Sequence, residues 1–405
     1  MTTIVMKFGG TSVASIDRIK NVANIIENKK KEGCKLAIIV SAMAGVTNDL
    51  VEKSKSISNH FSKEEYDVLL SSGEQVTSAL LAGCLVDKGI QARSMLGWQI
   101  PIVTEGQHKN SRIISVNSKS VQNYLEKDYV VVIPGFQGIS EEMRISTIGR
   151  GGSDASAVAL AKALDADRCE IYTDVEGVFT TNPEICEQAK KIDKISYDEM
   201  LEMASLGAKV MQSSSVQKAM INDVEIYVKS TFAPEKSGTQ ILSEDKISYE
   251  KVITGVAYSR DDAKVTLMGV KDKPGVASAI FKPLNDDNIV VDMIVQNISA
   301  DSNKTDVTFT VKRDDMLKAE NILKNLKSEI GYEKLLTDNK VSKVSIVGAG
   351  MITYPGVAFK MFNALATKKI NILVISTSEI RISVLVDDKN TELAVKTLHS
   401  AFELE

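Results

Sequence analysis

The chain has 405 residues, which is too long for one ordinary domain, so we expect two or three domains. Hydrophobic residues make up 43% and charged residues 25%, the usual balance for a soluble globular protein with a substantial core. The 49 basic and 53 acidic residues leave a formal charge of -4, so neither sign builds the dominant field that nucleic acid or an anionic membrane attracts. We therefore expect no nucleic acid and no membrane as partner.

The four cysteines and three histidines are scattered along the chain. Because they lack paired spacings, they indicate reduced thiols and predict neither a disulfide framework nor a metal site built by the protein. The opening MTTIVMKF lacks the pattern of a signal peptide, and no apolar run approaches the roughly 18 residues that span a bilayer. We expect a cytoplasmic protein.

Up to about residue 230, short apolar runs alternate with helical patterns. The helix predicted from about Ser15 places apolar residues on one face, and Gly33 lies just past its end. This alternation predicts an α/β fold with a mostly parallel sheet covered by helices on both faces. The predicted strands are 2–8, 36–42, 129–135, 169–173 and 224–228, and the predicted helices after the first are 63–88, 117–127, 153–165 and 197–220.

The last third of the chain contains an internal repeat after a polar boundary segment, 231–248. PGVASAIFKPLNDDNI (274–289) matches PGVAFKMFNALATKKI (355–370) at a constant offset of about 81 residues. A strand pattern of alternating apolar and polar residues precedes each copy, and another strand follows it. Each unit is therefore predicted to consist of a strand, a turn, a helix and a second strand. The repeat predicts two copies of one small α/β module.

KFGGTSV (7–13) ends the first predicted strand. Its two glycines allow the backbone to approach a phosphate, and Lys7 supplies a positive charge at the strand end. The segment matches neither a Walker A loop nor GxGxxG. A tight turn without a ligand is the alternative interpretation.

GRGGSDASAVALA (149–161) is more informative. Arg150 lies beside a Gly-Gly pair, Ser153 is placed as an N-cap, and Asp154 falls in the first turn of a helix of small residues. A glycine-rich loop at a helix N-terminus is suited to bind an anion. A plain capped helix would explain Ser153 and Asp154 but not Arg150, so we favour a functional interpretation.

Polar residues in two further segments are candidates for the same site. SSGE (71–74) puts Glu74 on an otherwise apolar helix, where it either faces solvent or contacts a ligand's ammonium group. SAMAGVTN (41–48) ends a buried strand with Ser41 and Thr47, which either bind ligand or form a turn.

Two later segments complete the set. Thr173 and Asp174 lie at the C-terminal end of another predicted strand, where open α/β sheets bind ligands. Lys209 follows a helix, where it either contacts a ligand or offsets the helix dipole. VGAG (347–350) resembles the start of a dinucleotide fingerprint, but Thr353 occupies the third glycine's position and the segment belongs to the repeat, so we expect no nicotinamide cofactor.

Taken in order and followed by two PGVA repeats, these motifs closely resemble those of the aspartate kinases, essentially from end to end. The resemblance implies an amino-acid-kinase-like, mostly parallel sheet sandwiched by helices, followed by two α+β ACT modules with a ferredoxin-like fold. It implies a catalytic domain over 1–235, a linker over 236–250, and ACT modules over 251–340 and 341–405. It also implies ATP, carrying Mg²⁺, and L-aspartate as substrates.

The resemblance assigns roles by position. Lys7, Asp154 and Arg150 would be catalytic, with Asp154 orienting Lys7 or the reacting groups. The nucleotide would contact Lys7, Phe8, Gly9, Gly10, Ser41, Thr173, Asp174, Phe179 and Lys209. Aspartate would contact Thr47, Glu74, Arg150 and Ser153, with Glu74 on its α-amino group and Arg150 on its α-carboxylate.

Two segments depart from the family pattern. GAKV is commonly continued by Leu-His-Pro, whereas this chain has Met211-Gln212-Ser213. Asp-Pro-Arg is common where this chain has Asn182-Pro183-Glu184, which removes a positive charge from a loop expected beside the nucleotide.

ACT modules bind amino acids as feedback signals, and they usually pair between subunits, so a homodimer or homotetramer is implied. Lysine or threonine is the implied effector, with lysine favoured by family habit. The effector would contact Asp272, Pro274, Gly275, Val276, Ala277, Val291, Asp292, Gln296, Val357, Ala358 and Asn371.

A related kinase of another amino acid, such as glutamate 5-kinase, is disfavoured by SSGE and the paired ACT units. A non-catalytic amino-acid sensor is disfavoured because Lys7, Glu74, Arg150 and Asp154 are all present.

Overall fold

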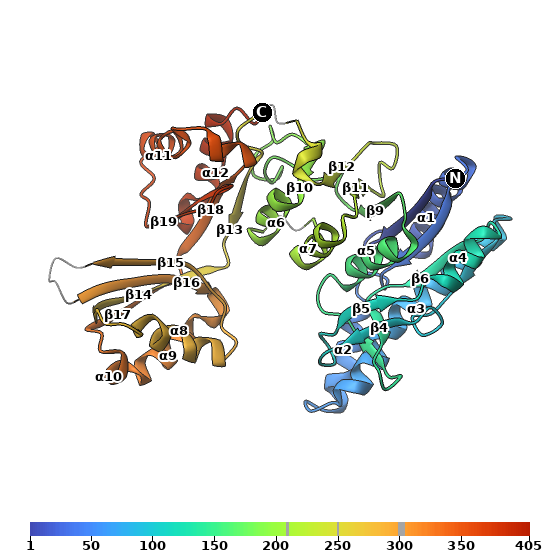
Figure 1. Ribbon diagram of the computed structural model, residues 1–405, viewed down its shortest axis with the longest axis horizontal. Helices are drawn as coiled ribbons and strands as arrows, with labels where there is room; N and C mark the ends of the chain where they lie inside the picture. The colour runs from blue at the N-terminus through green and yellow to red at the C-terminus, as the bar shows by residue number, and fades with distance from the viewer. Residues whose placement is uncertain (208–209, 249–250, 299–303) are drawn as a thin grey trace. The chain divides into compact units, whose positions relative to one another are not determined.

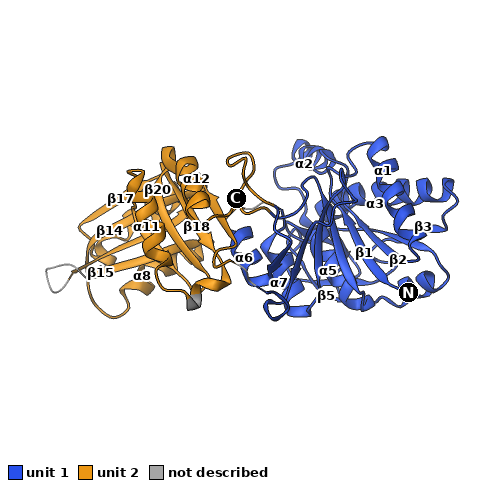
Figure 2. Cartoon of the chain, turned by 90° about the horizontal axis from the view of Figure 1, so that it is seen from above, with its two compact units in different colours: residues 1–178, 191–205, 209–248 blue, residues 179–190, 206–208, 249–405 orange. Residues whose placement is uncertain are grey.

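The computed structural model describes the chain apart from residues 208–209, 249–250 and 299–303 (Figure 1). The chain divides into two compact units (Figure 2). Unit 1 comprises residues 1–178, 191–205 and 209–248, and unit 2 comprises residues 179–190, 206–208 and 249–405. Residues 179–190 therefore leave unit 1 and pack as part of unit 2.

Unit 1 contains the predicted sheet, with eight strands in the order β10-β12-β11-β9-β1-β2-β6-β3. Its neighbouring strands are parallel except for the antiparallel pair β11 and β12, which confirms a mostly parallel sheet. The strands are β1 Thr3–Phe8, β2 Lys35–Val40, β3 Ala92–Ser94, β6 Val130–Pro134, β9 Arg168–Thr173, β10 Lys194–Ser196, β11 Ile226–Ser230 and β12 Thr239–Leu242.

Helices cover this sheet on both faces. Side chains of a strand alternate between the faces, so Ile4, Met6 and Phe8 join a core with α1 and α3 while Lys7 points to the opposite face, toward α5. The helices of unit 1 are α1 Ile16–Lys31, α2 Val46–Ile57, α3 Lys63–Asp87, α4 Lys119–Glu126, α5 Gly152–Leu164, α6 Tyr197–Ser205 and α7 Ser213–Asn222. The prediction of a sheet covered on both faces is confirmed.

Three predictions for unit 1 are wrong in detail. Residues 197–220 form α6 and α7 and not one helix, because Gly207 (φ 108°) adopts a left-handed conformation that ends the helical pattern. The residue before α5 is Gly151 (φ 75°), so Ser153 lies within the first turn and is not the N-cap. The expected linker contains β12, which pairs with the main sheet.

A second, smaller sheet of unit 1 was not predicted. Its strand order is β5-β4-β7-β8. The strands are β4 Ile102–Glu105, β5 Arg112–Val116, β7 Gln137–Ile139 and β8 Ile145–Thr147. Strands of three to five residues are too short to give a periodic pattern of hydrophobic residues.

Helix α3 is, among the described helices, the one that is long and apolar enough to cross a membrane by length and composition. Half of its apolar window is buried inside the structure, and buried Asp67 and Glu74 lie on it. These features are those of a core helix.

Unit 2 contains two four-stranded antiparallel sheets, β15-β16-β14-β17 and β13-β18-β20-β19. The strands of the first are β14 Asp262–Lys271, β15 Val291–Ile298, β16 Lys304–Lys312 and β17 Lys334–Asp338. Those of the second are β13 Gly255–Ser259, β18 Val341–Val347, β19 Val374–Thr377 and β20 Arg381–Asp387. The helices are α8 Val276–Asp286, α9 Met316–Asn325, α10 Lys327–Ile330, α11 Val357–Thr367 and α12 Thr391–Ala401.

The repeat is visible in the backbone. Gly275 and Gly356 precede α8 and α11 with φ of 91° and 92°, so each PGVA turn uses glycine in the same left-handed conformation. The predicted boundary between the two modules at residue 340 needs one correction. Strand β13 precedes the strands of the first sheet in the sequence, but it pairs with β18 and therefore belongs to the second sheet. Gly348 and Gly350 of VGAG pack against the backbone of Val252, which explains both glycines.

Candidate active site

A pocket of about 320 Å³ lies in unit 1 where the carboxyl ends of β1 and β2 meet the N-termini of α2 and α5 and the side of α3. Ligands of open α/β sheets bind at such strand ends. The pocket is lined by Lys7, Gly10, Ser41, Ala42, Met43, Ala44, Gly45, Thr47, Glu74, Phe136, Gly151, Gly152, Ser153 and Asp154.

Lys7 supplies positive charge to this pocket. Its Nζ lies 2.6 Å from Asp154 Oδ1, and the two side chains are 12% and 10% exposed. Asp154 belongs to the first turn of α5, whose N-terminal amide groups and dipole favour an anion. The pair therefore holds an ammonium group beside a helix N-terminus, an arrangement that can neutralise a bound phosphate.

The glycines after β1 allow close approach of the backbone. Gly9 N donates to Tyr172 O of β9 at 3.2 Å. A Cβ on Gly10 would lie 3.0 Å from the carbonyl oxygen of Ala42, so a larger residue would push the two strand ends apart. The Phe8 side chain stacks on Tyr172 in the core at 4.8 Å between ring centroids, so its predicted nucleotide contact does not involve its ring.

Glu74 is the strongest indication of a cationic ligand. Its side chain extends from α3 into the pocket and the residue is 4% exposed. Its Oε1 accepts a hydrogen bond from Ala42 N at 3.1 Å, while Oε2 finds no hydrogen-bond partner among the residues that the structure describes. Burial raises the pKa of Glu74 to about 7, and the Ala42 amide offsets part of this effect. A ligand ammonium group would satisfy the unpartnered oxygen.

Ser41, Thr47 and Ser153 line the pocket as predicted. Ser41 follows β2, and Thr47 lies in the first turn of α2 after left-handed Gly45 (φ 86°). Ser153 lies in the first turn of α5. Two helix N-termini thus open on the same pocket and bring hydroxyl groups with them.

The remaining predicted site residues lie elsewhere. Arg150 is exposed and immediately precedes the pocket-lining Gly151. Thr173 and Asp174 lie at the end of β9, beside β1, with Thr173 Oγ1 donating to Asp174 Oδ1 at 3.1 Å. Phe179 belongs to unit 2, so its contact with the nucleotide stays a prediction. Lys209 lies outside the described residues.

Phe136 is the lining residue that no predicted motif contains. Gly151, Gly152 and residues 42–45 lie within the predicted motifs but were not among the individual site residues. Phe136 has a φ of 66°, and a Cβ on Gly152 would lie 2.8 Å from its ring. The GG pair of GRGG was a usable signal for Gly152, but the contact with Phe136 depends on the fold and has no sequence pattern.

Among the expected effector residues, Asp292 is already engaged. Its Oδ2 lies 2.7 Å from Nζ of Lys343, a buried residue of β18 that is also 3.5 Å from Asp262 Oδ1. Burial alone would raise the pKa of Asp292, but the ion pair with Lys343 lowers it overall. Asp292 and Lys343 therefore link the first and second four-stranded sheets.

Comparison with known proteins decides the family. The amino acid kinase family model matches residues 2–230, and the ACT domain model matches residues 265–326 and 344–402. An aspartate kinase of Pseudomonas putida is 48% identical over 406 aligned residues, covering 100% of this chain and 98% of that protein. The chain belongs to the aspartate kinase family. Aspartokinase 2 of Bacillus subtilis is 45% identical, with 100% of this chain and 98% of that protein covered.

Solved aspartate kinases share the fold. Escherichia coli aspartokinase III in complex with aspartate and ADP, its R-state, matches with a TM-score of 0.81 at 25% identity, covering 99% of this chain and 100% of that chain. The same enzyme with lysine and aspartate, its T-state, gives a TM-score of 0.80 at 26% identity, covering 99% of each chain. Membership in the aspartate kinase family makes this chain a phosphotransferase and confirms the predicted succession of an amino-acid-kinase sheet and ACT modules.

Proposed function

We propose that this chain transfers the γ-phosphoryl group of ATP to the side-chain carboxylate of L-aspartate, producing ADP and 4-phospho-L-aspartate. The observation that carries the proposal is one pocket that combines an ammonium group at a helix N-terminus, Lys7, with an unpartnered buried carboxylate, Glu74. The first feature suits a phosphate and the second an α-amino group. Its relatives named aspartate kinase, and an aspartokinase solved with aspartate and ADP, support the same reaction.

The reaction requires little chemistry from the protein beyond charge and alignment. A carboxylate with an ordinary pKa of about 3.9 is ionised at neutral pH, so it attacks without a general base. One carboxylate oxygen forms a bond to the γ-phosphorus, the bond from that phosphorus to the β–γ bridging oxygen breaks, and ADP leaves with the electron pair. Lys7 and the α5 amide groups would reduce the repulsion between the two anions and hold them in line.

The Mg²⁺ that accompanies ATP would depend chiefly on the nucleotide. Within the part of the chain that the structure describes, no group of three or more His, Cys, Asp or Glu residues is placed to hold a metal ion. Phosphate oxygens and water suit Mg²⁺, and Asp174 at the end of β9 is the exposed carboxylate beside the strand that carries Lys7. The ion would neutralise phosphate charge during transfer.

Arg150 and Glu74 would hold the α-carboxylate and α-amino groups of aspartate. A bidentate pair between guanidinium and carboxylate contributes about 2–3 kcal/mol, so Arg150→Ala should raise the KM for aspartate roughly a hundredfold and leave the KM for ATP nearly unchanged. Aspartate-dependent ADP release, measured with each substrate varied, checks this. Arg93→Ala removes an exposed arginine from β3 of the same unit and is the matched control.

The same assay separates the rival functions. A glutamate 5-kinase would release more ADP with glutamate than with aspartate, and a non-catalytic sensor would release none with either. An unchanged KM for aspartate in Arg150→Ala would contradict the role of that residue while leaving the reaction itself standing.

We propose that the ACT modules bind lysine as a feedback inhibitor at the residues predicted for the effector. E. coli aspartokinase III has been solved with lysine in its T-state, which supports a lysine effector. An effector ammonium group at Asp292 would compete with Lys343 for that carboxylate. Inhibition assays with lysine, threonine and methionine in turn test the choice, and inhibition by threonine alone would contradict it.

We also propose a pathway, a location and an assembly. We place the enzyme at the first step of lysine, threonine and methionine biosynthesis, in the cytoplasm, as a homodimer or homotetramer paired through its ACT modules. Light scattering of the purified chain would contradict the assembly if it showed a monomer.

A further inference from the structure

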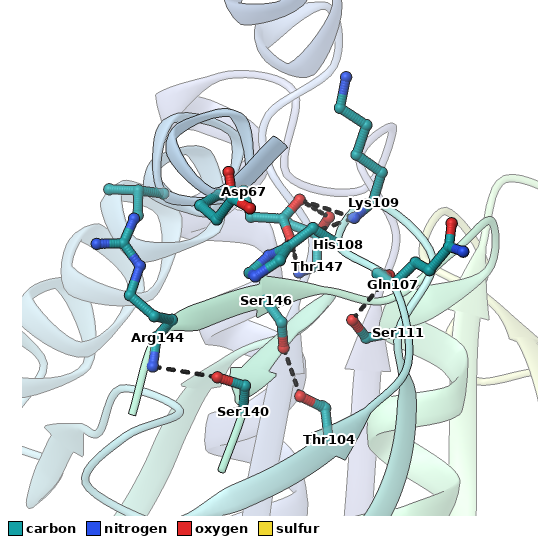
Figure 3. A network of polar contacts seen from close by, with 12 residues as sticks. Asp67, Thr104, Gln107, His108, Lys109, Ser111, Ser140, Arg144, Ser146 and Thr147 are labelled. Carbon is teal, nitrogen blue, oxygen red and sulfur yellow. Dashed lines mark hydrogen bonds and ion pairs between the residues drawn. The ribbon is translucent and has the colours of Figure 1, made fainter. Parts of the chain in front are cut away.

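Asp67 is a fully buried carboxylate outside the pocket. It lies in the first turns of α3 and its side chain is 0% exposed. Figure 3 shows it at the centre of a network of polar contacts that joins α3 to the small sheet of unit 1. A buried carboxylate is costly unless several donors compensate it, so its presence here requires an explanation.

The groups that contact the Asp67 carboxylate in this network are two backbone N–H groups, one hydroxyl group and one histidine ring nitrogen. Thr147 donates twice, from Oγ1 to Oδ1 at 2.6 Å and from its backbone N to Oδ2 at 3.0 Å. The backbone N of Lys109 lies 3.1 and 3.2 Å from the two oxygens, and His108 Nδ1 lies 2.7 Å from Oδ2. Two separate segments, β8 and the loop before β5, are thus fastened to one side chain of α3 (Figure 3).

The first of these segments leads into the active site. Thr147 is the last residue of β8, three residues before Arg150, and the turn continues into Gly151 and Gly152, which line the pocket. The second segment supports the same turn. Ser111 N donates to Thr147 O at 3.0 Å, and the side chain of Asn110 packs so closely on Gly149 that a Cβ there would lie 2.1 Å from its Oδ1.

Helix α3 also carries Glu74. Glu74 lies seven positions after Asp67, which is about two helical turns, so both side chains extend from the same face of the helix. One rigid helix therefore presents the carboxylate proposed for the α-amino group and fastens the strand that leads to the arginine proposed for the α-carboxylate.

We propose that Asp67 is a positioning residue that fixes the turn carrying Arg150 relative to Glu74, and that it thereby sets the spacing at which the α-amino and α-carboxylate groups of the substrate are held. The side-chain carboxylate of a bound amino acid reaches the phosphate only if that spacing is correct. Asp67 would therefore contribute to the choice of aspartate over its longer homologue. This inference rests on the roles proposed for Arg150 and Glu74.

Asparagine at position 67 has the shape of aspartate, but it turns an amide NH₂ toward groups that are themselves donors. A displaced turn would carry Arg150 away from the α-carboxylate and weaken a charge-assisted, bidentate contact that depends on exact geometry. We expect Asp67→Asn to raise the KM for aspartate roughly a hundredfold, to change the KM for ATP less than about threefold, and to lower the preference for aspartate over glutamate. Asp87→Asn, at an exposed position of the same helix, is the matched control.

Because Asp67→Asn is expected to destabilise the fold, a second pair of variants keeps the inference testable. Thr147→Val removes the hydroxyl that donates to Oδ1, whereas Thr147→Ser retains it. The backbone N of Thr147 still donates to Asp67 Oδ2 in the valine variant, so the turn is loosened only in part. We therefore expect the valine variant to raise the KM for aspartate roughly tenfold and the serine variant to restore it to within about twofold. Melting temperatures are measured alongside.

The inference is overturned if these variants lower the melting temperature but leave the KM for aspartate unchanged, or if they raise the KM for aspartate and for ATP equally. Arg150→Ala distinguishes a failure of the role proposed for Arg150 from a failure of the positioning role proposed for Asp67. If Arg150→Ala leaves the KM for aspartate unchanged, the proposed role of Arg150 fails and the inference fails with it. If Arg150→Ala raises that KM while the Asp67 and Thr147 variants do not, the positioning role alone is wrong.

Discussion

Lys7→Ala should lower turnover at least a thousandfold while the protein stays folded. Lys7 is the ammonium group at the end of β1, beside the N-terminus of α5, where the γ-phosphate is proposed to lie. Removing one preorganised donor from a transition state costs about a hundredfold to a thousandfold in turnover, and Lys7 carries a full charge as well. Single-turnover ADP formation at saturating ATP and aspartate measures the effect, with Lys20→Ala, an exposed lysine of α1, as control.

Lys7 also forms a buried ion pair with Asp154, so Lys7→Ala is expected to lower the stability of the fold as well as turnover. Removing one partner of a buried pair leaves an uncompensated charge and destabilises the fold by about 3–5 kcal/mol. The double variant Lys7→Met with Asp154→Asn removes both charges, so it should recover most of the stability but none of the turnover. If the double variant regained turnover together with stability, Lys7 would contribute to folding only and not to phosphoryl transfer.

Glu74→Gln should raise the KM for aspartate at least a hundredfold and abolish its dependence on pH near neutrality. An ammonium group binds the ionised carboxylate, and burial raises the pKa of Glu74 to about 7. In the wild-type enzyme, about a tenth of Glu74 is ionised at pH 6, so the KM for aspartate should fall roughly tenfold from pH 6 to pH 8. Initial rates from pH 6 to pH 8 measure this, and Glu52→Gln on α2 is an exposed control.

The same pKa has a consequence for the stability of the unliganded protein. The pKa is higher in the folded protein than in the unfolded chain, where it is about 4.5, so the folded state binds the proton more tightly. The stabilisation is complete below pH 4.5 and is lost as the pH rises through about 7, with a magnitude on the order of 3 kcal/mol. Denaturant titrations from pH 5 to pH 8 should therefore show a smaller loss of stability in Glu74→Gln. An equal loss in both proteins would contradict the assigned pKa.

Long periodic elements and repeated segments were predictable from sequence. Strand β1, helix α3 ending before Gly89, and the two PGVA modules appear where expected, because apolar periodicity and glycine turns act locally. Lys7 lies at the carboxyl end of β1, where ligands of open α/β sheets bind. The side of α3 and the N-terminus of α5 bring Glu74 and Asp154 to the same pocket.

What was missed depends on contacts between distant residues. The short strands β4, β5, β7 and β8 carry too few residues for a periodic pattern. Strand β13 pairs across more than eighty positions of intervening sequence, which no local pattern reveals. Asp67 resembles any acidic residue in the first turns of a helix, and only the fold places Thr147, His108 and Lys109 around it.

The proposed reaction requires a phosphate and an amino acid to meet between the end of β1 and the N-terminus of α5. A crystal structure with a non-hydrolysable ATP analogue and aspartate tests this most directly. We predict the terminal phosphate within about 3 Å of Lys7 Nζ, and the aspartate ammonium group at the same distance from Glu74 Oε2. A terminal phosphate remote from both Lys7 and the Gly151–Gly152 turn would contradict the account.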